Sequence, residues 1–364
     1  MSESPGVVRL LGCAATDRTP TSVNKDSNAA KALILELSNQ ILLARALAVV
    51  AELGIADLVA DEPKTADELA TATDSDRDSL YRLLRTLAGH GFFAEDDMGR
   101  IGLTPFAEVL QAAHPDSVRD LLCLDWQNIY WDTFRALPEA VRSGEIAFER
   151  AFGQGFFDYL KEHPQANAVF DRRMAGVSLA ENAKIAAVFP FGDFATLVDI
   201  GGGRGGLLVA ILAQHPTVSA SLFEQAQVLA DPADLRLAGL LDRVELLAGD
   251  FFVEAPSGAD VYTLKRIIHD WDDARAARVL QTCRAAMGKN SRILVIDAVM
   301  QPGNEADPNK DMDLGIMALT PGRERTEAEF RALFEQSGLR LACIIPPDPP
   351  STLSILEARR TIDR

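Results

Sequence analysis

The stretch TLVDIGGGRGGL, residues 196–207, decides the fold. It joins an apolar strand to a glycine-rich turn, and the run that follows it has the composition of a helix. Strand and helix patterns keep alternating beyond it. The expected strands are Thr196–Ile200, Val218–Phe223, Val244–Leu247, Asp260–Leu264 and Ile293–Asp297, and the expected helices are Leu207–Gln214, Ala226–Ala238 and Asp273–Ala286. This alternation predicts an α/β fold with a doubly wound parallel sheet.

The end of the chain breaks this alternation. Leu339–Ile345 and Leu353–Ala358 are two strand patterns joined by a short loop that contains prolines. Two strands joined this closely must pair antiparallel. We therefore expect a C-terminal antiparallel hairpin at the edge of the sheet.

The N-terminal part of the 364-residue chain is mostly helical in pattern. Residues 28–59 predict a long helix and then a short one, apolar over most of the circumference. Such a helix needs cover on several sides, and a second copy of the chain would supply it, so we expect a homodimer. Complete burial within one chain is the alternative.

A winged-helix pattern follows, with two short helices within residues 64–87 and a hairpin over residues 90–103. Thr65 and Glu68 have the spacing of a capping box. Many winged helices bind DNA, but residues 1–112 carry ten basic and seventeen acidic side chains. The whole chain has 36 basic and 53 acidic residues, a net charge of −17. This charge disfavours nucleic acid as a partner, although a ligand-binding winged-helix regulator remains an alternative.

Composition also bears on where the protein works. The four cysteines are scattered, which favours a reducing cytoplasm. No run of about 18 apolar residues is free of charge, so we expect no membrane-spanning helix and no membrane partner. Residues 1–27 have the composition of a mobile tail. Residues 113–190 form a helical region rich in aromatic side chains, which are either core or the walls of a flat pocket.

The glycine turn is a candidate ligand site. Gly201, Gly203 and Gly206 satisfy the GxGxxG pattern of dinucleotide sites, which alone leaves an NAD-dependent oxidoreductase open. Asp199 comes just before the turn, where a carboxylate would repel a pyrophosphate but suit a cationic group. This difference favours S-adenosylmethionine, whose sulfonium and ammonium groups are positive, over NAD.

Two further signals follow the next strands. Glu224 lies 18 residues after Gly206, at the end of the second strand, where an acid can accept hydrogen bonds from ribose hydroxyls. Asp250 and Phe251 follow the third strand, where they could accept from an adenine amino group and stack on its ring. Together the three signals predict a nucleoside site at the carboxyl edge of the sheet.

The segment LKRIIHDWDD, residues 264–273, ends the fourth strand and opens a helix. His269 is one of five histidines, and its ordinary pKa of about 6.5 suits a general base. The alternative is that Asp270 caps the helix and His269 only packs.

These motifs, in this order, resemble one known family. LVDIGGGRGG, Glu224, GDFF, LKRIIHDWDD, VIDAVM and GRERTEAEFRALFEQSGL are similar to the motifs of plant-type small-molecule O-methyltransferases, over roughly residues 28–360. The resemblance implies a Rossmann-like methyltransferase sheet and a winged-helix dimerisation domain. It divides the chain into a tail (1–27), a dimerisation domain (28–112), a helical acceptor-pocket region (113–190) and a catalytic domain (191–364).

The resemblance also implies site residues. His269 takes the acceptor proton, and Asp297 and Glu324 orient it. S-adenosylmethionine would be bound by Asp199, Gly201, Gly203, Glu224, Asp250, Phe251 and Lys265. The chain departs from the plant enzymes at Asp297, where many carry Glu, at Glu224 and Phe251, which replace Asp and Met, and at Arg266, which replaces Trp.

The implied reaction methylates a phenolic hydroxyl of an aromatic secondary metabolite such as a phenazine, anthracycline or polyketide. We expect no metal, and Asp307, Asp311 and Asp313 to be solvated. By analogy, the acceptor pocket is lined by Trp126, Tyr130, Trp131, Phe170, Met174, Trp271, Ile316, Met317 and Leu319.

Overall fold

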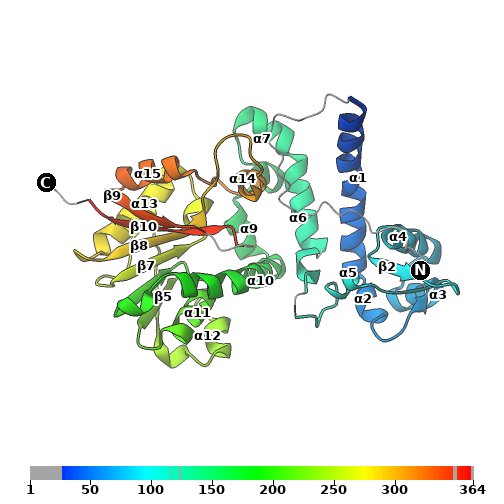
Figure 1. The fold of residues 1–364 in the computed structure, drawn as a ribbon, viewed down its shortest axis with the longest axis horizontal. Coiled ribbons are helices and arrows are strands. Elements are labelled where there is room, and N and C mark those ends of the chain that lie inside the picture. Colours follow the sequence, from blue (N-terminus) through cyan, green and yellow to red (C-terminus); the bar gives the residue numbers. More distant parts are fainter. Residues whose placement is uncertain (1–26, 116, 123, 347–350, 362–364) are drawn as a thin grey trace, which may run out of the picture. The chain divides into compact units, whose positions relative to one another are not determined.

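The computed structural model describes residues 27–115, 117–122, 124–346 and 351–361 (Figure 1). The predicted tail, residues 1–27, lies outside them except for its last residue. The chain divides into two compact units, Met1–Trp131 and Asp132–Arg364, which are described separately below.

A seven-stranded sheet forms the centre of the second unit, in the order β6-β5-β4-β7-β8-β10-β9. The first five strands in this order are parallel, and β10 pairs antiparallel with both β8 and β9. The strands are β4 (Thr196–Ile200), β5 (Ser219–Glu224), β6 (Val244–Ala248), β7 (Val261–Lys265), β8 (Arg292–Ala298), β9 (Leu339–Ile345) and β10 (Leu353–Arg360). Both the parallel sheet and the antiparallel hairpin at its edge are confirmed.

Helices cover both faces of this sheet (Figure 1). α13 (Asp273–Ala286) and α15 (Glu327–Gln336) enclose one apolar core. α10 (Pro164–Val188), α11 (Gly206–Gln214) and α12 (Ala233–Leu237) enclose the other. The predicted helix Ala226–Ala238 is wrong in its first half, because Pro232 lacks a backbone N–H and disfavours a helical residue before it. The helix begins only after that proline.

In the first unit, a long helix is followed along the chain by a winged helix, as the sequence predicted. α1 (Ser27–Glu52) and α2 (Ile55–Leu58) are separated by Gly54 at φ 64°. Thr65 and Glu68 form the expected capping box. The remaining elements are β1 (Lys64–Thr65), α3 (Ala66–Thr73), α4 (Arg77–Gly89), β2 (Phe93–Glu95), β3 (Arg100–Leu103) and α5 (Pro105–Glu108), with β3 in the middle of a three-stranded sheet.

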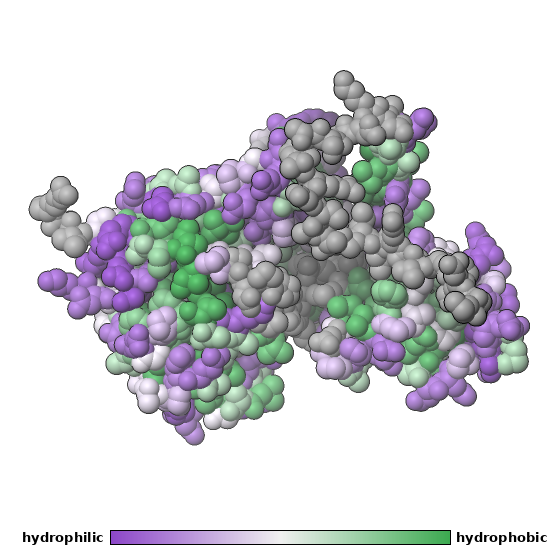
Figure 2. All heavy atoms as spheres, in the orientation of Figure 1, coloured by the Kyte–Doolittle hydropathy of each residue, from purple (hydrophilic) through white to green (hydrophobic). Residues whose placement is uncertain are grey.

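α1 leaves much of its apolar surface exposed. Green apolar atoms lie along this helix in Figure 2. The exposed side chains are Leu33, Ile34, Leu35, Leu37, Ile41 and Leu42. By length and composition alone, Asn28–Glu52 is the one described helix that could cross a membrane, a test that core helices of soluble proteins also pass. It contains Lys31, Glu36 and Arg45, and the expectation of no membrane-spanning helix stays a prediction. The surface is that of a helix which needs another apolar surface against it.

The aromatic side chains around residue 150 pack mainly on one another. Phe148 is fully buried and its ring lies 4.5 Å from that of Phe152 and 5.3 Å from that of Phe156. Phe156 in turn lies 5.4 Å from Phe170 on α10. The helices of this region are α6 (Leu124–Arg135), α7 (Leu137–Ser143), α8 (Ala147–Phe152) and α9 (Phe156–Glu162), with α14 (Pro308–Leu319) from later in the chain. Phe148 and Phe156 are core residues, whereas Phe152 and Phe170 are only partly buried, so both interpretations of these aromatic side chains stay open.

Candidate functional site

The turn between β4 and α11 leaves room for a ligand. Gly201, Gly203 and Gly205 all have positive φ, a conformation that L side chains rarely adopt. A Cβ on Gly201 would lie 2.6 Å from the Ile267 side chain, whereas nothing lies within 4 Å of a Cβ on Gly203. The turn is therefore packed against β7's end on one side and open at Gly203.

Asp199 points its free carboxylate oxygen at this turn. Its Oδ1 accepts a hydrogen bond of 2.6 Å from the Thr263 hydroxyl, and a Cβ on Gly202 would lie 2.3 Å from its Oδ2. Oδ2 is buried without a hydrogen-bond partner among the described residues. Burial raises the pKa of Asp199 to about 7. A buried, unpartnered acceptor of this kind suits a cationic or hydrogen-bond-donating ligand.

Glu224 ties the ends of neighbouring strands to the turn. Its carboxylate accepts hydrogen bonds from the backbone N–H groups of Gly203, at 3.1 Å, and Gln225, at 2.7 Å. The Gly249 N–H donates to the Glu224 carbonyl, which brings Asp250 and Phe251 to the same edge. Asp250 is exposed, and its Oδ1 accepts from the Phe252 N–H. The structure thus brings these predicted cofactor residues to one edge of the sheet.

A buried ion cluster holds the end of β7. Lys265 Nζ lies 3.1 Å from the Glu181 carboxylate and donates to the Ser178 hydroxyl at 2.9 Å, and Arg266 Nη2 lies 2.6 Å from the same carboxylate. Arg266 adopts φ 55°, a left-handed conformation unusual for a side chain of this size. Lys265 is therefore engaged with α10, and its role toward the cofactor stays a prediction.

His269 is buried in a 3₁₀ turn (Ile268–Asp270) directly after this cluster. Its Nδ1 lies 2.9 Å from Glu324 Oε1, and its Nε2 lies 3.6 Å from Asp270 Oδ1. Asp272, and not Asp270, caps α13 by accepting from the Arg275 N–H. The alternative in which Asp270 caps the helix is therefore wrong.

Asp297 makes no such contact. It is fully buried on β8, and neither carboxylate oxygen has a hydrogen-bond partner among the described residues. Burial, with the neighbouring carboxylates, raises the pKa of Asp297 to about 7, although His269 and Arg266 oppose the shift. An aspartate is one methylene shorter than a glutamate, which agrees with a carboxylate that acts on the imidazole only through space.

The acids dominate the electrostatics of His269. Burial alone would lower the pKa of His269, but Asp270, Asp297 and Glu324 outweigh it and raise that pKa to about 9. Asp270 in turn has its own pKa raised to about 6, mainly by burial. The result is a strongly basic imidazole in an acidic cluster assembled from three separate segments.

The residues predicted to bind the acceptor lie on several elements and differ in exposure. The Trp271 ring lies 4.8 Å from that of Phe252, 6.3 Å from Phe251 and 6.0 Å from Phe157, so it joins the predicted adenine side to the aromatic cluster. Phe170 and Met174 lie one turn apart on α10, on which Ser178 and Glu181 also lie. On α14, Ile316 and Leu319 are mostly buried and Met317 is 41% exposed.

The remaining acceptor predictions concern α6. Tyr130 and Trp131 belong to the first unit, and the Trp126 side chain lies outside the described residues. Their roles stay predictions.

Several residues that matter here were missed or misjudged from the sequence. Asp313 accepts a 2.8 Å hydrogen bond from the Glu324 N–H, and Asp307 caps α14, so the expectation that both are only solvated is wrong. Asp311 is exposed, as expected. Glu181 is one of two acidic residues in α10 and has no motif around it in the sequence. The described residues contain no group of three side chains arranged for a metal, and the metal-free reaction stays a prediction.

Comparison with known proteins identifies the family of both units. Residues 134–340 match the O-methyltransferase domain, and residues 35–112 match the O-methyltransferase dimerisation domain. A phenazine O-methyltransferase of Lysobacter antibioticus is 40% identical, over 90% of this chain and 95% of its own length. The solved structure of a mitomycin 7-O-methyltransferase is 37% identical, with a TM-score of 0.86 over 92% of this chain and 98% of that one.

A third relative was solved with both ligands. An O-methyltransferase from neocarzinostatin biosynthesis, in complex with S-adenosylmethionine and 2-hydroxy-5-methyl naphthoic acid, is 33% identical, with a TM-score of 0.79 over 88% of this chain and 96% of that one. The chain belongs to the S-adenosylmethionine-dependent O-methyltransferase family, in which this catalytic domain follows a dimerisation domain.

Proposed function

We propose that this enzyme transfers a methyl group from S-adenosylmethionine to a phenolic hydroxyl of an aromatic secondary metabolite, and that His269 removes the phenol proton. The observation that carries the proposal is the buried contact of 2.9 Å between His269 Nδ1 and Glu324, at the same sheet edge as the glycine turn. A base beside the site of a methyl donor is what the reaction needs.

The residues at the turn fit the cofactor. Asp199 Oδ2, unpartnered among the described residues, offers a negative group to the cationic end, and Glu224 and Asp250 offer acceptors at the ends of β5 and β6. The open side of Gly203 allows a ligand to approach the backbone. When bound, S-adenosylmethionine supplies an electrophilic methyl group on a sulfonium, which is already a good leaving group.

The chemistry left to the protein is to place the hydroxyl oxygen and to accept its proton. If Nδ1–H donates to Glu324, the lone pair of His269 is on Nε2, which then accepts the proton. The pKa of His269, raised to about 9 by the acids around it, approaches the ~10 of an ordinary phenol, so proton transfer between them is nearly balanced. Glu324 and Asp297 then stabilise the imidazolium that forms.

An aromatic acceptor is supported by two observations. The relatives named above are a phenazine O-methyltransferase, a mitomycin 7-O-methyltransferase and an O-methyltransferase from neocarzinostatin biosynthesis. In this chain, Trp271 comes two residues after His269 in the sequence, and its ring lies beside those of Phe157 and Phe252. Flat rings stack well against such side chains.

We also infer a homodimer that is formed through the first unit. The match to the dimerisation domain and the exposed apolar surface of α1 support it. Packing two copies of α1 would remove that surface from water. The four-segment division of the chain and the cytoplasmic location stay predictions.

The test is a methyl-transfer assay with labelled S-adenosylmethionine and a panel of phenols and matched aromatic amines. We expect transfer to a hydroxylated phenazine, naphthoate or quinone. His269→Asn should lower kcat by about 100-fold or more and leave the Kd for S-adenosylhomocysteine unchanged. Full activity of His269→Asn, or transfer only to the amines, would contradict the proposal.

A further inference from the structure

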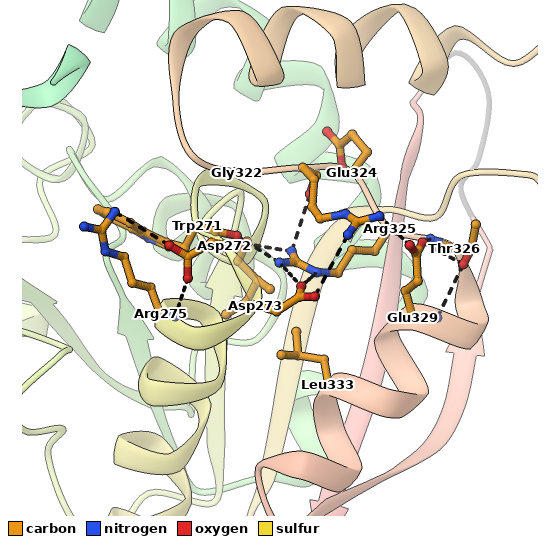
Figure 3. A network of polar contacts seen from close by, with 12 residues as sticks. Trp271, Asp272, Asp273, Arg275, Gly322, Glu324, Arg325, Thr326, Glu329 and Leu333 are labelled. Atoms are coloured by element: carbon orange, nitrogen blue, oxygen red, sulfur yellow. Dashed lines mark hydrogen bonds and ion pairs between the residues drawn. The ribbon is translucent and has the colours of Figure 1, made fainter. Parts of the chain in front are cut away.

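Arg325 lies between the two segments that carry the proposed base and its carboxylate. The side chain is fully buried, which is rare for arginine. It is the neighbour of Glu324 in sequence, yet in Figure 3 its guanidinium points at the Trp271–Asp273 side of the loop that follows His269. A buried arginine in this place needs an explanation.

Every N–H of this guanidinium has an acceptor. Nη1 donates to the backbone carbonyls of Ile268, at 3.1 Å, and Arg323, at 3.4 Å. Nη2 donates to the Trp271 carbonyl and to Asp273 Oδ1, both at 2.8 Å, and Nε donates to the same Asp273 oxygen at 3.0 Å. Two of these acceptors, the Ile268 and Trp271 carbonyls, lie on either side of His269 in the sequence.

The backbones of the two segments are also in direct contact. The Arg323 N–H donates to the His269 carbonyl at 2.9 Å, and a Cβ on Gly322 would lie 1.9 Å from that same oxygen. The Arg325 carbonyl accepts from the Met300 N–H, which ties the segment to the end of β8. Three stretches that are distant in sequence meet here: the Arg325 side chain joins its own segment to the His269 loop, and its backbone carbonyl joins that segment to the end of β8.

We propose that Arg325 is a positioning residue for methyl transfer: it locks the His269 loop to the Glu324 segment and thereby sets the contact between imidazole and carboxylate. The inference rests on the proposed role of His269 as the base. Arg325 does not touch the imidazole, so it acts through the backbone on both sides of it. A shift of about 1 Å between reacting groups is enough to lower a rate by about 100-fold.

Geometry, rather than charge, is what this site requires of residue 325. A guanidinium is a planar fork that serves several fixed acceptors at once, whereas an ammonium has three donors at one point. A lysine would keep the positive charge beside Asp273 but could not reach both carbonyls and the carboxylate together. Arg325→Lys therefore separates the two roles.

The experiment measures kcat, KM, the Kd for S-adenosylhomocysteine and the pH profile of the full-length Arg325→Lys enzyme. We expect kcat to fall by about 10- to 100-fold and the Kd to stay within about twofold. The acidic limb of the kcat profile should move to lower pH, because a loosened Glu324 no longer supports the imidazolium. Arg331→Lys on α15 is the matched control, since its exposed side chain pairs with Glu327 on the same helix, and it should behave as wild type.

Asp273→Ala keeps the inference testable if Arg325→Lys does not fold. Asp273 is exposed, and α13 keeps its cap because that cap is Asp272. Asp273 accepts from both Nε and Nη2 of Arg325, and its removal should lower kcat by less than Arg325→Lys does. The acidic limb of the kcat profile should again move to lower pH. A loss of S-adenosylhomocysteine affinity equal to the loss of kcat, or a limb that stays in place in both variants, would overturn the positioning role.

His269→Asn separates this inference from the proposed function. If His269→Asn is inactive and Arg325→Lys has wild-type kcat and pH profile, the positioning role is wrong and the base stands. If His269→Asn is active, the proposed function itself fails.

Discussion

The two ends of the site are built in different ways. The cofactor edge is made of short turns that follow parallel strands. There the Gly203 N–H donates to Glu224, and Asp199 and Glu224 lie at the ends of the paired strands β4 and β5. The base cluster instead combines His269, Asp297 and Glu324 from segments far apart in sequence, and its strongest contact joins two buried side chains. The cofactor edge therefore depends on local backbone geometry. The base cluster depends on tertiary packing that brings charged side chains from distant segments together.

This difference predicts that substitutions at the two ends change different quantities. At the base cluster, kcat and its pH dependence should change. At the cofactor edge, the Kd for S-adenosylhomocysteine should change. A variant that changed kcat and the Kd for S-adenosylhomocysteine by the same factor would contradict this division.

The largest effect is expected for Glu324→Gln. Loss of the carboxylate lowers the pKa of His269, so the acidic limb of kcat/KM, which rises with pH as the imidazole loses its proton, moves from about 9 to lower pH. The maximum rate should also fall by about 100-fold, because the imidazolium loses its charged partner. Initial rates from pH 6 to 10 measure both changes.

Asp297→Asn is the matched control for that prediction. Asp297 has no hydrogen bond to the imidazole, so the limb should move in the same direction but less far, with a smaller fall in rate. A larger effect at Asp297 than at Glu324 would contradict the geometry.

An intermediate effect is expected for Gly201→Ala. The residue has φ 68°, and its Cβ would lie 2.6 Å from the end of the Ile267 side chain, so either that side chain or the turn must shift. We expect the Kd for S-adenosylhomocysteine to rise about tenfold, the equivalent of about 1.4 kcal/mol, in a calorimetric titration. Gly203→Ala is the matched comparison, because Gly203 also has a positive φ but its Cβ would meet no atom within 4 Å. An equal rise in Kd for the two variants would show that the clash with Ile267 is not the cause.

The smallest effect is expected for Thr263→Val. The hydroxyl donates to Asp199 Oδ1, and its loss leaves a buried carboxylate without a hydrogen bond among the described residues. The pKa of Asp199 then rises further, so the carboxylate is more protonated at neutral pH and holds a cationic ligand less well. A few-fold rise in the Kd for S-adenosylmethionine, with an unchanged His269 limb, is the expected result, and a shifted limb would contradict it.

The local features were predictable from the sequence, and the long-range ones only in part. The glycine turn, the alternating strands and the capping box of Thr65 each depend on a few adjacent residues. GxGxxG alone left an NAD enzyme open, and family membership excludes that alternative. The failed half of the helix Ala226–Ala238 shows how one proline overrides an otherwise helical composition.

The base cluster shows where sequence reasoning ends. Only the family resemblance pairs His269 with Glu324, since their 55-residue separation gives no periodic signal. The Glu181 contacts to Lys265 and Arg266, and the buried fork of Arg325, depend on which faces of distant elements meet. The sequence predicts a solvated Asp313, because its partner is a backbone N–H whose position a sequence does not show.

The most direct test of the central claim is an NMR titration of the His269 imidazole in the full-length enzyme. The chain has five histidines, and the signal missing from His269→Asn assigns the one that matters. The acidic cluster predicts titration near the pKa of about 9 for His269, moving down in Glu324→Gln. Titration near the ordinary ~6.5 in both proteins would contradict the account.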